Sequence, residues 1–228
     1  NQQLQSLDQL TYRAQDVMTQ PVVTVESQET LGVATSKMIK HGLKRLPVVD
    51  GKGRLVGILS RLDVLRQVAQ SGEMIPARQL HKAAVLHLED VMSSDVPVVG
   101  EDDTLGILVD KFASTASHRL IVLDLSGEAV GLMSDSDVVA RVNPEKRSGI
   151  LDALRNLGKP PAGKESARDL MSPAPLTAEP GELVVEALKR MLAEGRKWLV
   201  VIDPQGKPLG LVDRQIMLES ILEMPEQA

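Results

Sequence analysis

The sequence predicts an α+β protein in which one unit, ordered strand, helix, strand, strand, helix (β-α-β-β-α), occurs three times and packs in pairs. The first observation is an ungapped self-alignment on Met18, Met92 and Met171. In each copy an aspartate lies 32 residues and a glycine 39 residues after the methionine. The second observation is the alternation of helical apolar stripes with short, continuous apolar runs. The three segments are therefore repeats of one structural unit.

Each unit begins with a strand and a helix. Residues 21–25 form a short β-branched run that is typical of a strand. The next segment carries apolar residues at the i, i+3, i+4, i+7 and i+8 spacing of a helix with one buried face. This stripe comprises Leu105, Leu108, Val109, Phe112 and Ala113 in the second copy, and Val184, Ala187, Leu188, Met191 and Leu192 in the third.

Two further strands and a second helix complete the unit. Residues 46–49, 120–123 and 199–202 are continuous apolar runs, which are typical of buried strands. A turn that contains glycine leads from each run into the next strand, and a helix begins after that strand.

The repeats divide the chain into segments. We expect a linker or tail at 1–13, unit one at 14–70, a linker at 71–87, unit two at 88–142, a linker with a short helix at 143–166, and unit three at 167–224. The short helix is indicated by Ile150, Leu151, Leu154 and Leu157, which end at Gly158. Its position between two units suggests a helix that bridges the members of a pair.

Three units cannot all pair within one chain. A single unit of about 55 residues buries little surface, so pairing is expected. Either an upstream unit is missing or one unit pairs across a dimer. We favour units two and three as the complete pair, with unit one as the second half of a truncated pair. Pairing of units one and two is the alternative.

Composition excludes several classes of partner. A net charge of −5 over 228 residues gives no electrostatic reason to expect nucleic acid or an anionic membrane surface. The chain has only three aromatic residues, too few for the stacking platforms that bind single strands. No apolar run approaches the roughly 20 residues of a membrane helix, no signal peptide opens the chain, and cysteine is absent. These features predict a cytoplasmic protein without nucleic acid or membrane partners.

A Gly-x-x-Ser-x-x-Asp motif joins the last strand of a unit to its last helix. It comprises Gly57, Ser60 and Asp63 in the first copy and Gly131, Ser134 and Asp137 in the second. A helix start presents unpaired N–H groups and a partial positive charge, which suit a phosphate. A carboxylate there can accept two hydrogen bonds from a ribose diol. These groups suit a ligand that carries a phosphate and a diol.

Helix capping is the competing interpretation of the same residues. Ser-x-x-Asp at a helix start is close to a capping box, and capping alone would explain Ser60, Ser134 and also Asp213 of the third copy. Capping does not require the acid three residues later, and the third copy has Ile216 at that position. The contrast between the copies favours ligand binding at the two intact motifs.

Three features lie at fixed offsets: the Asp-Val-Met opening (16–18), the Leu-Pro-Val-Val-Asp strand (46–50) and the Gly-x-x-Ser-x-x-Asp motif. Because of these features, residues 14–222 outside the linkers resemble tandem CBS domains. These regulatory modules are named for cystathionine β-synthase. The resemblance implies β-α-β-β-α units packed in pairs through their sheets. It further implies clefts between the paired units that take AMP, ADP, ATP or S-adenosylmethionine. It also implies that the motif serine contacts phosphate and the aspartate holds the ribose hydroxyls, which assigns Ser60 with Asp63 and Ser134 with Asp137. In the third copy Asp213 would repel phosphate, and Ile216 cannot accept hydrogen bonds from ribose hydroxyls. That site is therefore expected to be empty or specialised for something else.

A second polar position precedes the middle strand of each unit. It carries Lys44-Arg45, His118-Arg119 and Lys197-Trp198. Arg45 and Arg119 are candidates to contact a nucleotide's phosphates, and solvated charges at a strand edge are the alternative. Trp198 replaces the arginine in the third copy and is expected to fill a core or interface gap rather than stack on a base.

The sequence contains no metal-ligand spacing, HExxH or nucleophile elbow, so we expect no enzyme. We predict a regulatory module that requires no cofactor, binds an adenosine-containing nucleotide (AMP, ADP, ATP or S-adenosylmethionine) and transmits this to an unknown effector domain or protein. The alternative is a structural or oligomerisation module without a ligand. We expect a homodimer.

Overall fold

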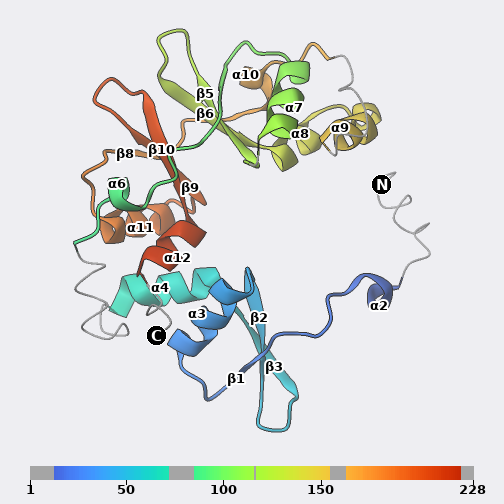
Figure 1. The fold of residues 1–228 in the computed structure, drawn as a ribbon, viewed down its shortest axis with the longest axis vertical. Coiled ribbons are helices and arrows are strands. Elements are labelled where there is room, and N and C mark those ends of the chain that lie inside the picture. The colour runs from blue at the N-terminus through green and yellow to red at the C-terminus, as the bar shows by residue number, and fades with distance from the viewer. Residues whose placement is uncertain (1–12, 72–84, 116, 155–162, 222–228) are drawn as a thin grey trace. The chain divides into compact units, whose positions relative to one another are not determined.

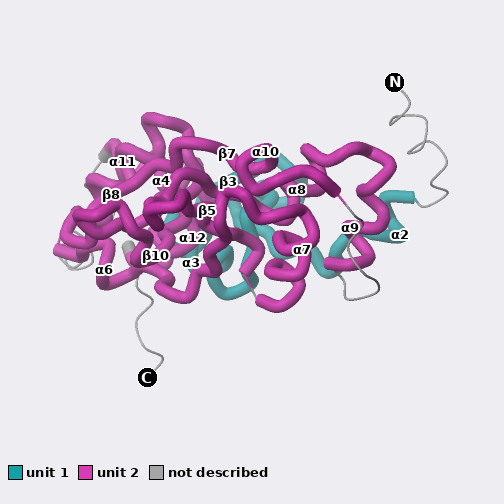
Figure 2. Tube along the Cα trace, turned by 90° about the horizontal axis from the view of Figure 1, so that it is seen from above, with its two compact units in different colours: residues 1–60 teal, residues 61–228 magenta. Residues whose placement is uncertain are grey.

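The structure is a computed structural model that describes residues 13–71, 85–115, 117–154 and 163–221 (Figure 1). It divides into two compact units, residues 1–60 and residues 61–228, which Figure 2 colours separately. Mixed helices and three sheets confirm the predicted α+β fold. The description below takes each compact unit by itself.

The first compact unit contains most of the first repeat. Its elements are α2 (Ala14–Val17), β1 (Val25–Glu26), α3 (Leu31–Lys40), β2 (Arg45–Val49) and β3 (Leu55–Ser60). The strands form a sheet in the order β1-β2-β3, with β1 parallel and β3 antiparallel to β2. One face of the amphipathic helix α3 packs on this sheet, so Val25, Ala34, Met38 and Leu46 form a small core.

The second compact unit contains the last helix of the first repeat and all of the second. Its first elements are α4 (Arg61–Ser71), α6 (Leu88–Val91), β4 (Val98–Gly100), α7 (Leu105–Ser114), β5 (Arg119–Leu123), β6 (Ala129–Ser134), α8 (Asp135–Arg141), the 3-10 helix η1 (Pro144–Lys146) and α9 (Arg147–Leu154). Strands β4, β5 and β6 repeat the arrangement of β1, β2 and β3. A largely aliphatic core lies between this sheet and helices α7, α8 and α9.

The third repeat completes this unit. It consists of α10 (Ala167–Leu170), β7 (Ser172–Pro173), β8 (Thr177–Ala178), α11 (Val184–Ala193), β9 (Trp198–Ile202), β10 (Pro208–Asp213) and α12 (Arg214–Ile221). Helix α4 packs against α11 and α12 (Figure 1). Val64 and Leu65 of α4 are buried, and Arg61 Nη1 donates to Gln215 Oε1 at 2.8 Å.

The antiparallel strand pairs have the same register in all three repeats. The first residue of the middle strand lies opposite the motif residue that ends the next strand: Arg45 opposite Ser60, Arg119 opposite Ser134, and Trp198 opposite Asp213. The gapless alignment therefore reflects one conserved backbone geometry within the chain.

Two predicted elements differ from the structure in detail. The first strand is limited to Val25 and Glu26, because only these two residues pair with β2; the prediction of 21–25 was too long. The predicted linker helix exists as α9, but it packs on α7 and α8 with Ile150 and Ala153 in the core of the second repeat. It therefore belongs to that repeat and does not bridge a pair. Leu157 lies outside the described residues.

The second and third repeats form a pair through their sheets, as predicted. Ile121 and Leu132 are neighbours on β5 and β6, and Val200 and Leu211 are neighbours on β9 and β10. These four side chains pack together in one buried cluster. The sheet face of the second repeat is therefore used by the third, in agreement with the favoured pairing of units two and three. Across the ranges that the structure describes, no helix has both the length and the apolar composition to cross a membrane.

Candidate ligand-binding clefts

The two paired repeats exchange their opening helices. Helix α6 of the second repeat lies on the third, where Leu88 N donates to Glu182 O at 3.0 Å. Helix α10 of the third repeat lies on the second, where Ala167 N donates to Asp103 O at 2.8 Å. Residues 79 positions apart are equivalent in the two repeats, so the exchange is reciprocal. The arrangement creates two related clefts, each between one repeat's motif and the other repeat's opening segment.

A methionine of one repeat packs on the motif glycine of the other. A Cβ at Gly131 would lie 2.1 Å from Met171 Sδ, and a Cβ at Gly210 would lie 2.8 Å from Met92 Sδ. Neither position has room for a side chain. The glycine and the methionine of the repeated sequence are therefore two halves of one contact.

Ser134 and Asp137 lie at the junction of β6 and α8 and form a capping box. Ser134 Oγ accepts from Asp137 N at 3.1 Å and donates to Asp137 Oδ2 at 2.7 Å. The Ser134 N–H also donates to Asp137 Oδ2, at 3.0 Å. Asp137 Oδ1 lies 3.8 Å from Arg141 Nη2 and makes no closer contact within the described residues. Capping therefore uses one carboxylate oxygen and leaves the second available to a ligand.

Arg141 is a cation at this cleft that sequence reasoning did not identify. Its guanidinium donates to Leu170 O at 2.8 Å, to Met171 O, and to Ser172 Oγ at 2.8 Å. It thus ties the opening segment of the third repeat to the motif of the second. No repeated signal marks the position, because the equivalent residues in the other copies are Gln67 and Ser220.

Asp135 adds a second carboxylate beside the motif. Its Oδ2 lies 2.8 Å from His118 Nδ1, and its Oδ1 accepts from Ser136 N at 2.6 Å. Two acids at the start of α8 oppose the approach of a highly charged polyphosphate. Arg141, 3.8 Å from Asp137, offsets part of this negative charge.

Arg119 lies between the two motifs. Its guanidinium carbon is 4.4 Å from the centroid of the Trp198 ring, and Nη2 is 4.0 Å from Asp213 Oδ2. Burial lowers the pKa of Arg119, while Asp213 and Asp135 act in the opposite direction. The structure thus places Arg119 opposite Ser134 on the neighbouring strand but directs its side chain toward the third repeat's motif. Trp198 packs against the interface cluster, as the sequence predicted.

A cavity of about 520 Å³ occupies the cleft at the third repeat's motif. It is lined by Ser93, Asp95, Val96, Pro97, Ser114, Thr115, Ser117, Arg119, Leu211, Asp213 and Ile216. Asp213 Oδ1 accepts from Gln215 N and Ile216 N at 2.8 and 2.9 Å, so the third motif keeps a helix cap. Ile216 places an aliphatic side chain where the second repeat has Asp137. This cleft has room for a small molecule but lacks the acid of the intact motif.

The candidate ligand-binding residues of the first repeat lie near one another in the sequence. Ser60 ends β3, and Asp63 is an exposed residue in the first turn of α4. Arg45 is exposed and lies opposite Ser60 on β2.

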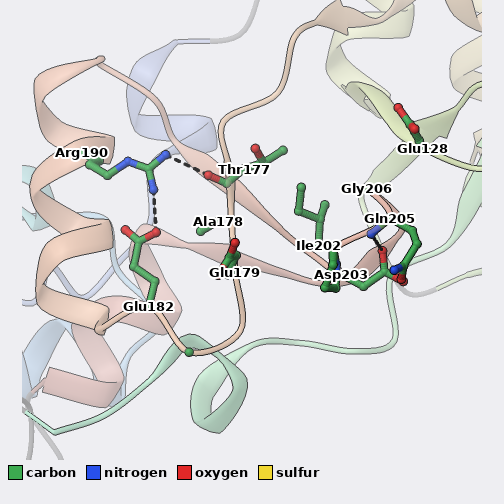
Figure 3. A pocket seen from close by; sticks show the side chains of 12 residues that line it. Glu128, Thr177, Ala178, Glu179, Glu182, Arg190, Ile202, Asp203, Gln205 and Gly206 are labelled. Atoms are coloured by element: carbon green, nitrogen blue, oxygen red, sulfur yellow. Dashed lines mark hydrogen bonds and ion pairs between the residues drawn. The ribbon is translucent and has the colours of Figure 1, made fainter.

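A larger pocket of about 840 Å³ lies on the third repeat beside β8 and the turn between β9 and β10 (Figure 3). Its lining carries the acids Glu128, Glu179, Glu182 and Asp203. Arg190, the lining cation, already donates to Glu182 Oε2 at 2.6 Å and to Thr177 O at 2.9 Å. This pocket does not suit a phosphate. In the described ranges no three His, Asp or Glu side chains are grouped to hold a metal ion.

The family of the chain follows from three matches along it. The sequence model of the CBS domain matches residues 14–70, 88–143 and 167–223, which together exceed half of the chain. The chain belongs to the CBS domain family. Each match contains one of the three aligned repeats, so the resemblance read from the sequence is confirmed.

Two curated relatives and a solved structure illustrate what the chain is similar to. The 5'-AMP-activated protein kinase subunit gamma-3 of Sus scrofa is 26% identical over 206 residues, covering 90% of this chain and 39% of that protein. The L-aspartate semialdehyde sulfurtransferase of Methanocaldococcus jannaschii is 26% identical over 123 residues, 54% of this chain and 22% of that enzyme. A crystal structure of an uncharacterized conserved protein from Pyrococcus horikoshii superposes with a TM-score of 0.63 at 24% identity, covering 90% of this chain and 80% of that one. This CBS domain chain thus spans less than half the length of these two curated relatives.

Proposed function

We propose that this CBS domain protein is a regulatory module that binds an adenosine-containing ligand between its second and third repeats. The observation that carries the proposal is the reciprocal exchange of opening helices, which puts the intact Ser134–Asp137 motif beside the other repeat. A ligand in that cleft would contact both repeats and favour one arrangement of the pair. Its effect would equal its difference in affinity for the two arrangements.

The chemistry of the second motif supports this role. Asp137 Oδ1 can accept hydrogen bonds from a ribose diol while Oδ2 keeps the helix cap. Ser134 Oγ has a second lone pair for a ligand donor. Arg141 can reach a phosphate if it exchanges one of its carbonyl contacts. We further propose Arg119 as a phosphate contact and Ser60, Asp63 and Arg45 as the equivalent set of the first repeat.

AMP is the first ligand to test. The AMP-activated kinase subunit is a relative over most of this chain, and its name states activation by AMP. The two carboxylates of Asp135 and Asp137 favour one phosphate over three. S-adenosylmethionine carries no phosphate, so these two carboxylates do not oppose its binding. ADP and ATP complete the panel.

The remaining features of the proposal concern partners. We propose that the module is not itself an enzyme and acts on an effector domain or protein, since the matched residues are CBS domains throughout. The absence of cysteine suits the cytoplasmic location that we propose. We also propose a homodimer.

The test is calorimetric titration of the full chain with AMP, ADP, ATP and S-adenosylmethionine, together with thermal unfolding. A ligand at 100 times its dissociation constant stabilises the folded state by about 2.7 kcal/mol, which is readily detected. Asp137→Ala should remove this stabilisation. Absence of binding at concentrations up to about 1 mM would refute the proposal.

A matched control separates ligand binding from helix capping. Ser166 and Asp169 form a capping box of the same geometry, in which Asp169 Oδ2 accepts from Ser166 N and Ser166 Oγ, both at 2.9 Å. Asp169→Ala therefore removes an equivalent cap and should leave the ligand-induced stabilisation intact. If no ligand stabilises the unmodified chain or either variant, the alternative of a purely structural module holds.

A further inference from the structure

The opening segments of the second and third repeats are held by equivalent backbone hydrogen bonds. In the third repeat Ala167 N donates to Asp103 O at 2.8 Å, and in the second Leu88 N donates to Glu182 O at 3.0 Å. Two further backbone bonds are shared by the two segments in the same way. Because the backbone gives both segments the same support, a difference in how firmly they are held must come from side chains.

Arg141 ties down the opening segment of the third repeat and has no counterpart in the other cleft. Its guanidinium donates to Leu170 O and to Ser172 Oγ at 2.8 Å each. The equivalent residue for the opening segment of the second repeat is Ser220. The Ser220 hydroxyl donates to Met217 O of its own helix at 3.0 Å. One opening segment is therefore bound by a cation, and the other is not.

An ion pair shows the same asymmetry. Arg168 Nη2 of the third repeat's opening segment lies 2.9 Å from Glu101 Oε1 of the second repeat. The equivalent residues on the other side are Glu89 and Pro180, which cannot form an ion pair. Among the described residues, no ion pair or side-chain hydrogen bond joins residues 86–93 to the third repeat. Exposed ion pairs contribute little each, so most of the difference comes from Arg141.

The less firmly held segment, residues 86–93, continues into one wall of the cavity at the third motif. Ser93, Asp95, Val96 and Pro97 all line this cavity of about 520 Å³. The opposite wall includes the third motif itself. A displacement of residues 86–93 would carry the first wall with it, so the size of this cavity depends on whether the segment stays attached.

We propose that residues 86–93 form a strap that detaches from the third repeat while the opening segment of the third repeat stays attached to the second. A segment detaches only when all of its contacts break together, so the segment with fewer contacts opens more often. Detachment of the strap opens the cavity at the third motif. The contact of Arg141 beside the Ser134–Asp137 motif remains in place, so the third cleft is the adaptable one of the pair.

Hydrogen exchange of the full chain, followed by NMR, tests the strap without any ligand. Protection factors allow equivalent amides to be compared, because they correct for the intrinsic exchange rate of each residue. A hydrogen bond from a charged group shifts an opening equilibrium by about tenfold or more. The protection factor of the Leu88 amide should therefore be at least about tenfold lower than that of the Ala167 amide. A smaller difference, or the reverse order, would overturn the proposal.

Arg141→Ser identifies the cause, because serine is the residue at the equivalent position of the third repeat. This variant should lower the protection factor of the Ala167 amide by about tenfold or more and leave that of Leu88 unchanged. Arg147→Ser is the matched control, since Arg147 Nη2 donates to Ala140 O at 3.0 Å within the second repeat. It should change neither amide. An Arg141→Ser variant that keeps the original difference would overturn the proposal.

Urea separates detachment of the strap from unfolding of the whole pair, and this measurement needs no variant. Local detachment exposes little surface, so exchange of the Leu88 amide should depend only weakly on urea concentration. Exchange of the amide of Leu199, a fully buried residue of β9, should depend steeply on urea because it requires unfolding. If the Leu88 amide instead shows the same steep dependence as Leu199, the strap does not open by itself and the proposal is wrong.

Discussion

Replacing Gly131 with alanine perturbs the contact through which the second and third repeats hold each other. An ideal Cβ at this position would lie 2.1 Å from Met171 Sδ, 2.9 Å from Cγ and 3.0 Å from Cβ. Atoms do not approach this closely, so Met171 must change its conformation or the opening segment of the third repeat must move. That segment has little freedom, because Arg141 holds Leu170 O and Ser172 Oγ at 2.8 Å each.

Inserting an extra carbon into a well-packed contact costs about 1–3 kcal/mol. For a chain of this size each kcal/mol lowers Tm by about 2–4 °C, so Gly131→Ala should unfold between about 2 and 12 °C earlier. Calorimetry or urea unfolding monitored by circular dichroism measures the change. Gly106→Ala is the control, since a Cβ at Gly106 in α7 meets nothing within 4 Å and should be tolerated.

A double-mutant cycle identifies the cause. Met171→Ala removes the atoms that obstruct the new Cβ, so the double variant should be less destabilised than the sum of the two single variants by about 1 kcal/mol or more. Additive effects would show that Gly131 and Met171 do not touch in solution. The same result would refute the exchange of opening segments and, with it, the geometry proposed for the clefts.

The third motif and an ion pair supply two more predictions. The double variant Asp213→Ser, Ile216→Asp recreates the intact motif in the third repeat and removes the carboxylate that faces Arg119. Calorimetry should therefore show the ligand stoichiometry rising from one to two per pair of repeats. An unchanged stoichiometry would contradict the role given to the motif. The Lys146 side chain, 2.8 Å away, holds the pKa of Glu165 below its ordinary value of 4.5. This contribution to stability is present above that value and lost as pH falls through the lowered pKa. The stability advantage over Glu165→Gln should therefore be constant from pH 7 to about 5 and shrink toward pH 3 in urea titrations; a constant difference would contradict it.

Local patterns were enough to predict the repeated elements. The stripe of Val184, Ala187, Leu188, Met191 and Leu192 predicts α11. The first four residues are fully buried and Leu192 is half-buried. The gapless alignment agrees with the equal strand registers that the structure shows at Arg45, Arg119 and Trp198. Such features depend on residues close in the sequence, so a sequence can specify them without reference to the rest of the fold.

Contacts between repeats could not be predicted in the same way. The sequence marked the methionine and the glycine as repeated but contained no sign that they meet across repeats, because the contact joins residues 40 positions apart in one case and 118 in the other. Arg141 was missed for a related reason, since its partners are backbone carbonyls, which any residue can supply. Helix α9 was found but assigned to a bridge, because its apolar face fits either role.

Capping and ligand binding cannot be separated at Ser134 by sequence, because the same atoms perform both. The structure bears on the choice between capping and ligand binding, because it shows which carboxylate oxygen of Asp137 the cap uses. Oδ2 of Asp137 is occupied by the Ser134 N–H and hydroxyl, and Oδ1 is left facing Arg141. The capping box at Asp169 also uses one carboxylate oxygen, so the second oxygen of Asp137 permits ligand binding, and the Asp169→Ala control is needed to separate binding from capping.

The asymmetry between the two clefts has a mechanical consequence under the proposed function. The cluster of Ile121, Leu132, Val200 and Leu211 lies between the motifs of the two repeats and can act as a pivot. A pair with two equal sites would be stabilised equally on both sides of that pivot and would gain rigidity without a preferred direction. With Asp137 on one side and Ile216 on the other, a single ligand closes one cleft only, so its binding energy favours a rotation of one sense. Loss of the third motif therefore suits a module that signals through orientation.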